Sequence, residues 1–229
     1  MYLIAALAYA FSIFIDISVY YIKYYIQDNK NIRYILSLIN IFQYSARAFV
    51  LIFVPVMSYL TETVKDKNKV WEITLITHVF VVLFLLLLFH NKFIINFSKF
   101  IIKILNVLFG KSKKIEIIHF KPVEKNYSVF KSSTLLFFSV SYLAGFLFSF
   151  SISFLYIFSF YFPTKALMLS SFAQIINMFG ALLLILFIDP KIMSLIDKEQ
   201  GLFEIKVFTI SRILVHITLV IILFLIRLH

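Results

Sequence analysis

Residues 40–55 read NIFQYSARAFVLIFVP, a run typical of a membrane-buried helix except for the arginine at position 47. A charged side chain at the centre of a membrane helix costs roughly 2.5–3.5 kcal/mol on insertion scales. The fold must therefore either compensate the charge of Arg47 or use it. Pro55 closes the stretch and is a candidate for a helix kink, because it frees a backbone carbonyl one turn back.

The composition of the whole chain is that of an integral membrane protein. Of its 229 residues, 62% are hydrophobic and 19% are aromatic, and the mean hydropathy is +0.98. A spanning helix needs about 20 mainly apolar residues. Six segments qualify, at about 2–22, 34–60, 73–90, 133–162, 166–188 and 207–226. We predict an all-α polytopic protein with one membrane domain, residues 1–229, in which Gly145 is a candidate bend.

Residues and motifs that the sequence lacks argue against several chemistries. There is no cysteine, so disulfides, thiolate metal sites and cysteine nucleophiles are excluded. No GxxxxGKS/T phosphate loop and no HExxH motif occurs, and the five histidines are too scattered to suggest a metal site. We therefore expect no metal, no other cofactor and no catalytic residue. An enzyme is the least supported function.

Between the third and fourth spans, residues 92–109 have the pattern of an amphipathic helix. Their polar residues recur at steps of four, three, four and three, at Lys92, Asn96, Lys99, Lys103 and Asn106, which places them on one helical face. Such a helix is expected to lie on an anionic membrane surface. The alternative is a plain continuation of the third helix out of the bilayer.

The distribution of basic residues predicts the orientation. Placing residues 91–131 in the cytoplasm puts most lysines and arginines inside and both termini outside. The net charge of +11 then belongs mainly to the cytoplasmic membrane surface and favours anionic lipids. A nucleic-acid partner is not expected in a chain this apolar, and protein partners cannot be named. Three spans in each half would also give inverted halves, an idea supported weakly by Leu38–Phe42 (LINIF) and Ile175–Phe179 (IINMF).

Polar residues cluster at particular depths of the predicted spans. On the second span, Ser37, Asn40, Tyr44 and Arg47 share one face, with Gln43 beside it. Asp16, Asp189 and Arg212 lie in the cytoplasmic half, with His216 one turn deeper than Arg212. Asp16 with Arg47 and Asp189 with Arg212 are the expected charge pairs, although the sequence does not fix the pairing. Gln174 and Asn177 form a further polar stripe. Contacts that merely hold the helices in register are the alternative reading of these residues.

The same stretches resemble the Amj family of bacterial alternative lipid II flippases. The resemblance rests on Ile15-Asp16, on SLINIFQYSARAFVLIFVP at 37–55, and on FIDPKIMSLIDKEQG at 187–201 followed by Ser211-Arg212. Val50 and Phe53 depart from it, since the family tends to carry Asn and Gln there. The resemblance implies transport of the undecaprenyl-linked peptidoglycan precursor from the inner to the outer leaflet of the bacterial inner membrane.

The physical reading is compatible with this function without depending on it. An anionic diphosphate with a polar head group cannot cross about 30 Å of hydrocarbon unaided. We expect Arg47 and Arg212 to contact the phosphates, with Asn40, Gln43 and Asn177 as further substrate-binding residues. Asp16, Asp189 and His216 would then serve as charge partners or coupling groups. Two other functions remain open: a secondary transporter or channel for a small ion or metabolite, with proton or cation sites at Asp16 and His216, and a scaffold subunit without transport.

Overall fold

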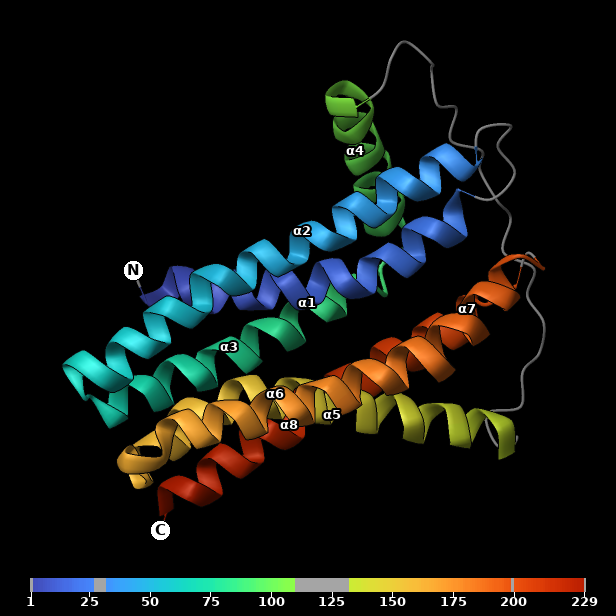
Figure 1. Ribbon diagram of the computed structural model, residues 1–229. Helices are drawn as coiled ribbons and strands as arrows, with labels where there is room; N and C mark the ends of the chain where they lie inside the picture. Colours follow the sequence, from blue (N-terminus) through green and yellow to red (C-terminus); the bar gives the residue numbers. More distant parts are fainter. Residues whose placement is uncertain (1, 27–31, 110–131, 199, 229) are drawn as a thin grey trace.

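The protein is a bundle of long helices packed side by side. The computed structural model describes residues 2–26, 32–109, 132–198 and 200–228, and within these it contains six helices long and apolar enough to cross a membrane. Figure 1 shows α1, α2 and α3 on one side of the bundle and α5, α6 and α8 on the other. The prediction of an all-α chain with six helices long and apolar enough to span a membrane is therefore confirmed for the described residues, whereas insertion into a membrane stays a prediction.

The N-terminal side is built around α1 (Tyr2–Tyr25), which is buried along most of its length. Beside it lie α2 (Ile32–Ser58), which widens into the π-helix η1 (Tyr59–Val64), and α3 (Lys67–Leu87). Pro55 lies inside α2, and the helix continues through it. The predicted third span, 73–90, corresponds to a helix that begins six residues earlier, because Asp66 caps it by accepting from the backbone N–H of Lys69 at 2.9 Å.

The C-terminal side contains α5 (Ser132–Tyr161), the short 3-10 turn η2 (Pro163–Lys165), α6 (Ala166–Leu183), the π-helix η3 (Leu184–Ile188), α7 (Asp189–Ile196) and α8 (Leu202–Leu228). The predicted fifth span ended at residue 188, whereas the helical segment continues to Ile196. Pro190 stands in the first turn of α7, directly after the π-helix η3, and the helical segment passes through it. Helices α5 and α6 approach closely at Gly180, where a Cβ would lie 2.9 Å from the carbonyl oxygen of Ala144.

Hydrogen bonds between distant helices join the two sides of the bundle. The indole N–H of Trp71 on α3 donates to the carbonyl of Leu223 on α8 at 2.9 Å. The hydroxyls of Tyr21 on α1 and Thr209 on α8 are 3.0 Å apart. Both contacts are buried, where an unmade hydrogen bond would be costly. They help to fix α8 against α1 and α3, and thereby the position of Arg212 on α8.

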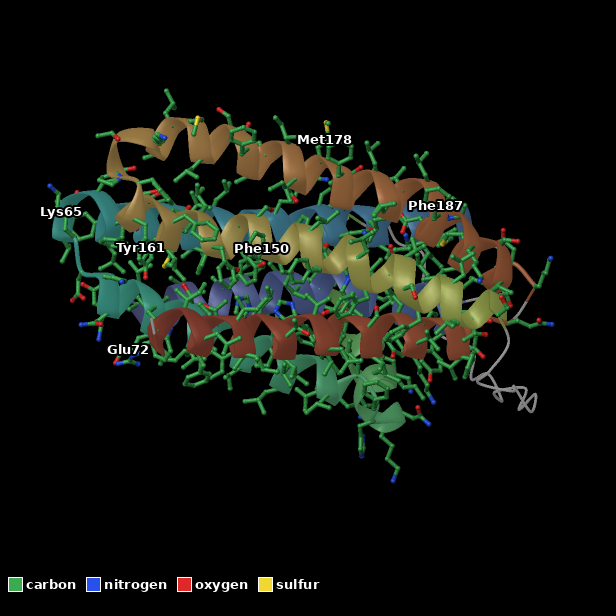
Figure 2. All side chains as sticks on the ribbon, turned by 90° about the horizontal axis from the view of Figure 1, so that it is seen from below. Lys65, Glu72, Phe150, Tyr161, Met178 and Phe187 are labelled. Carbon is green, nitrogen blue, oxygen red and sulfur yellow. The ribbon has the colours of Figure 1, made fainter. Side chains whose placement is uncertain are left out.

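The outer surface carries large apolar side chains. Met178 is 53% exposed and Phe187 is 57% exposed, and Figure 2 shows both on the outside of the bundle. Soluble monomers rarely expose apolar patches of this extent. The surface therefore agrees with the prediction that these helices face lipid.

Helix α4 (Asn91–Phe109) is separate from α3 and is joined to it by a turn at residues 88–90. It stands out across the direction of the long helices (Figure 1). Ile94, Ile101, Ile102 and Leu105 are buried, while Lys92 and Lys103 are exposed. The helix is thus not a straight continuation of α3, and its place on a membrane surface stays a prediction. The basic segment 110–131 and the side chain of Asn106 lie outside the described residues.

The start of α1 and the end of α8 lie at the same end of the bundle (Figure 1). An even number of crossings requires this arrangement. The side of the membrane on which that end lies, and the inverted relation of the two halves, stay predictions.

Candidate functional site

A cavity of about 370 Å³ brings most of the predicted polar residues together. We call it the arginine cavity, because Arg47 of α2 and Arg212 of α8 both line it. Asp16 of α1 and Asp189 of α7 also line it, and so does Lys23. Three basic and two acidic side chains from four helices therefore surround one space.

Helix α1 supplies one wall of the arginine cavity through three polar residues, of which the sequence analysis predicted one. Asp16, Tyr20 and Lys23 all line the arginine cavity. They are spaced by four and three residues, so they lie on one face of the helix. The sequence prediction named Asp16 of this face, and the structure adds Tyr20 and Lys23.

Asp189 makes a different contact from the one expected. It accepts a hydrogen bond from the hydroxyl of Tyr20. Among the described residues the structure contains one ion pair within 4.0 Å, Lys69 with Glu72, so the expected pairs of Asp16 with Arg47 and Asp189 with Arg212 are not formed. The charges line a shared space instead of neutralising one another by direct contact.

Arg212 reaches the cavity through a gap that a glycine leaves in α5. Its side chain is only 7% exposed, and its guanidinium carbon lies 5.0 Å from the ring centre of Phe208. A Cβ at Gly145 would lie 2.4 Å from Nη1 and 2.9 Å from Cδ of this arginine. The helix α5 is unbroken at Gly145. The role of this glycine in the structure is therefore to make room for Arg212.

Arg47 lies on the exposed side of the cavity. Its guanidinium carbon is 5.4 Å from the ring centre of Tyr44, and Tyr44 itself is 65% exposed. Asn40 and Gln43 line the same cavity, as their helical spacing predicted. On the opposite wall, Ile185 of η3 is also exposed. The arginine cavity thus opens on the side of the bundle, between α2 and the segment formed by α6 and η3.

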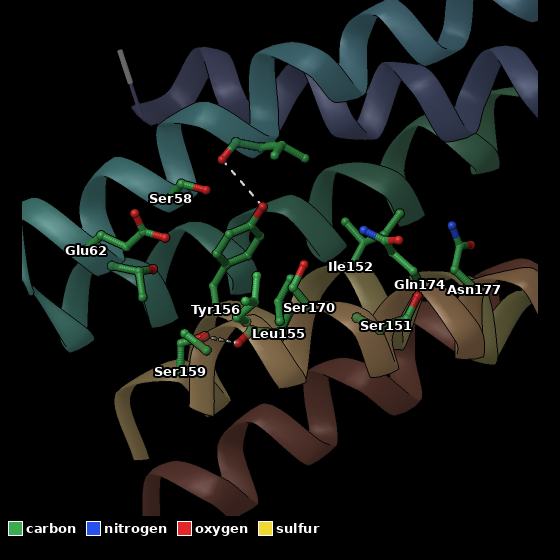
Figure 3. Close-up of a pocket in the computed structure, with 15 residues that line it drawn as sticks. Ser58, Glu62, Ser151, Ile152, Leu155, Tyr156, Ser159, Ser170, Gln174 and Asn177 are labelled. Atoms are coloured by element: carbon green, nitrogen blue, oxygen red, sulfur yellow. Dashed lines mark hydrogen bonds between the residues drawn. The ribbon is translucent and has the colours of Figure 1, made fainter. Parts of the chain in front are cut away.

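Asn177 and Gln174 do not join the arginines. They line a second cavity of about 540 Å³, which we call the hydroxyl cavity because Ser58, Thr61, Ser151, Ser159 and Ser170 also line it. Figure 3 shows these residues on α2, η1, α5 and α6. Both cavities have α2 on one wall and α6 on the opposite wall, and they follow one another along these helices. Asn177 therefore lines a separate cavity, further along α6 than the one that contains the arginines.

His216 lines neither the arginine cavity nor the hydroxyl cavity. It is paired with His78, for which the sequence analysis predicted no role. Its Nδ1 is 2.9 Å from Nδ1 of His78 on α3, and both side chains are fully buried. A hydrogen bond between two imidazole nitrogens needs one donor and one acceptor, so at least one ring is neutral. The two residues are 138 positions apart, and nothing local in the sequence indicates the pair.

The arrangement has the chemistry of a binding site for an anionic group. Arginine donates hydrogen bonds in a planar fork that matches phosphate or carboxylate oxygens. In the described part of the chain, no group of three or more histidine, aspartate or glutamate side chains could hold a metal ion.

Comparisons with protein-family models, with curated protein sequences and with solved structures found no match to this chain.

Proposed function

We propose that this protein is a flippase that moves a lipid with an anionic diphosphate head group, the lipid-linked peptidoglycan precursor, across the bacterial inner membrane. The observation that carries the proposal is the arginine cavity, in which Arg47 and Arg212 line one space that opens on the side of the bundle. A site open in this direction can accept a head group while the lipid tail stays in the bilayer.

The positions of the two cavities support a path between α2 and α6, which we call the groove. The head group would leave the arginine cavity past Val50 and Gly180 and enter the hydroxyl cavity near Val54 and Asn177. Throughout this movement the polar head would contact polar side chains, which lowers the cost of leaving water. The lipid tail would remain outside the groove, where the surface is apolar.

The uneven burial of the two arginines supports a division of roles. Arg212 is buried and held beside Gly145, so it offers a fixed charge at the back of the cavity. Arg47 is exposed at the opening. Arg47 would first attract the diphosphate, and Arg212 would then bind it. Lys99 and Lys103 on α4 would concentrate anionic lipid nearby.

The test is transport of a defined lipid by the purified protein in proteoliposomes. The probe is a fluorescent polyprenyl diphosphate lipid, and a fluorescent phosphatidylcholine serves as the zwitterionic comparison. We expect transport of the diphosphate lipid that Arg47→Ala and Arg212→Ala each reduce at least about tenfold, since one charge-assisted hydrogen bond is worth about 1.5–3 kcal/mol. The matched control is Arg227→Ala, because this arginine stacks 4.0 Å from the ring of Trp71 and lies outside both cavities.

The same variants should be compared in a bacterium depleted of its lipid II flippases. Growth rescued by the unchanged protein and lost in both cavity variants is the expected outcome. Equal transport of both lipids, or full rescue by Arg47→Ala together with Arg212→Ala, contradicts the proposed role of the cavity.

A second candidate function is favoured by the buried pair of His78 and His216. A hydrogen-bonded imidazole pair can pass a proton from one ring to the other, which is a step that a proton-coupled secondary transporter for a small ion or metabolite requires. That function predicts flux of a soluble solute that depends on the pH gradient and does not require the diphosphate lipid. Measuring both fluxes in the same proteoliposomes separates the two functions.

A further inference from the structure

The hydroxyl cavity has a chemistry of its own. It lies between η1 and the ends of α2, α5 and α6 that are far from Arg212. Figure 3 shows Glu62 toward one end of this space and Gln174 and Asn177 toward the other. Its lining contains the carboxylate of Glu62 and no lysine, arginine or histidine.

Several hydroxyls that line this cavity donate their one hydrogen to a backbone carbonyl. Thr61 donates to the carbonyl of Met57 at 2.8 Å, Ser151 to Phe148 at 2.9 Å, and Ser159 to Leu155 at 2.9 Å. A hydroxyl has one hydrogen and two lone pairs. These three side chains therefore face a ligand as acceptors.

The remaining donors of the lining are uncharged, among them the amide N–H groups of Gln174 and Asn177. Two further groups add acceptors. The side-chain oxygen of Asn177 is buried and has no hydrogen-bond partner. Glu62 makes no ion pair among the described residues. Glu62 is exposed at one end of the cavity, and its carboxylate attracts a positively charged partner over a neutral or negative one.

We propose that the hydroxyl cavity is a binding site for an ammonium group, a cation that also donates hydrogen bonds. The group can belong to a lipid head group or to a free small amine. A phosphate suits the arginine cavity better, because here it would meet lone pairs and a carboxylate. The diphosphate of a transported lipid would therefore pass this cavity without being held in it. This inference goes beyond the proposed function, because it does not require that the arginine cavity bind a diphosphate.

Because the sequence contains no cysteine, one introduced thiol can be modified selectively. Ser170→Cys places one thiol among the residues that line the hydroxyl cavity. Its modification rate is measured in the purified full chain with a cationic reagent, aminoethyl methanethiosulfonate, and an anionic one, sulfonatoethyl methanethiosulfonate. After correction for the reagents' rates with a free thiol, we expect the cationic reagent to be favoured by about tenfold or more.

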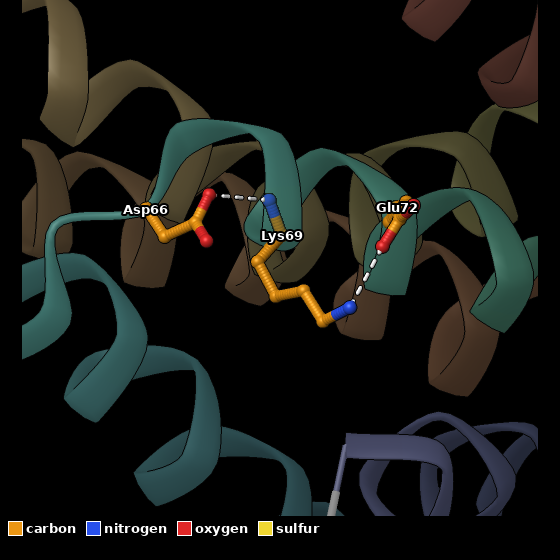
Figure 4. Close-up of polar contacts among 3 residues, drawn as sticks. All are labelled: Asp66, Lys69 and Glu72. Atoms are coloured by element: carbon orange, nitrogen blue, oxygen red, sulfur yellow. Dashed lines mark hydrogen bonds and ion pairs between the residues drawn. The ribbon is translucent and has the colours of Figure 1, made fainter.

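Two glutamate substitutions, each made together with Ser170→Cys, test whether Glu62 causes the preference for the cationic reagent. Glu62→Gln should remove most of the cationic preference. The matched control is Glu72→Gln, since Glu72 forms an ion pair with Lys69 at 3.0 Å in the first turns of α3. Figure 4 shows this pair beside Asp66. The control should leave the preference unchanged, and the unfolding temperature of each variant reports whether the fold is kept.

Protection experiments distinguish the source of the ammonium group. The protein is placed in phosphatidylcholine nanodiscs, and either phosphatidylethanolamine is added to the bilayer or ethanolamine to the water. Slower modification with phosphatidylethanolamine alone assigns a lipid head group, and slower modification with ethanolamine assigns a soluble amine. The inference is overturned if neither compound protects the thiol, or if Glu62→Gln retains the full cationic preference. Neither result depends on lipid transport, so the proposed function can survive them.

Discussion

Gly145→Ala should impair lipid transport by displacing an arginine on another helix. The added Cβ would lie 2.4 Å from Nη1, 2.9 Å from Cδ and 3.1 Å from Cζ of Arg212. Favourable contacts between heavy atoms lie at about 3.5–4.0 Å. The guanidinium must therefore retreat by about 1 Å, and the cavity is the space open to it.

Two effects on stability oppose each other in this variant. Alanine is favoured over glycine in a helix interior by about 1 kcal/mol, whereas overpacking a buried contact costs about 1–3 kcal/mol. The expected result is a free energy of unfolding that is unchanged or lower by up to about 2 kcal/mol. If Arg212 loses one charge-assisted contact with the phosphates, worth about 1.5–3 kcal/mol, apparent affinity for the diphosphate lipid falls roughly ten- to a hundredfold.

The assay is transport of the fluorescent diphosphate lipid over a range of lipid concentrations, combined with thermal unfolding in a mild detergent. Ser149→Ala, one turn further along the same face of α5, is the control, because Ser149 lines neither the arginine cavity nor the hydroxyl cavity. If Gly145 acts through Arg212, Gly145→Ala should add little to the loss caused by Arg212→Ala. A Gly145→Ala variant that is more stable and transports lipid at the original rate refutes the reasoning, and so does an additive loss.

Two further substitutions test contacts that no sequence pattern indicated. Tyr20→Phe removes the hydroxyl that donates to Asp189 and should lower the free energy of unfolding by about 1–3 kcal/mol; an unchanged unfolding temperature would mean that this bond contributes nothing. His78→Phe and His216→Phe should each destabilise the protein, because the remaining imidazole loses its buried partner. The double substitution should then cost less than the sum of the single ones, and strict additivity of the unfolding free energies would contradict the pairing.

The sequence predicted the number and approximate places of the long helices. Hydropathy over about 20 residues is a local property, so it does not depend on how helices pack. Helical periodicity also placed Asn40, Gln43 and Arg47 on neighbouring positions of one face, and all three line the arginine cavity. Helix ends were predicted less well, because a cap such as Asp66 extends α3 beyond its apolar run and because the helical segment of α6 and η3 continues through Pro190 into α7.

By itself, then, the sequence determined an apolar all-helical chain and the positions of its charged residues. The tertiary structure decided which of these residues meet. Asp189 contacts Tyr20 and not Arg212, His216 meets His78, and Asn177 lies in the hydroxyl cavity. The physical reason is that periodicity fixes a residue's direction from its own helix axis. The rotation and depth of one helix against another follow from the packing of the whole bundle.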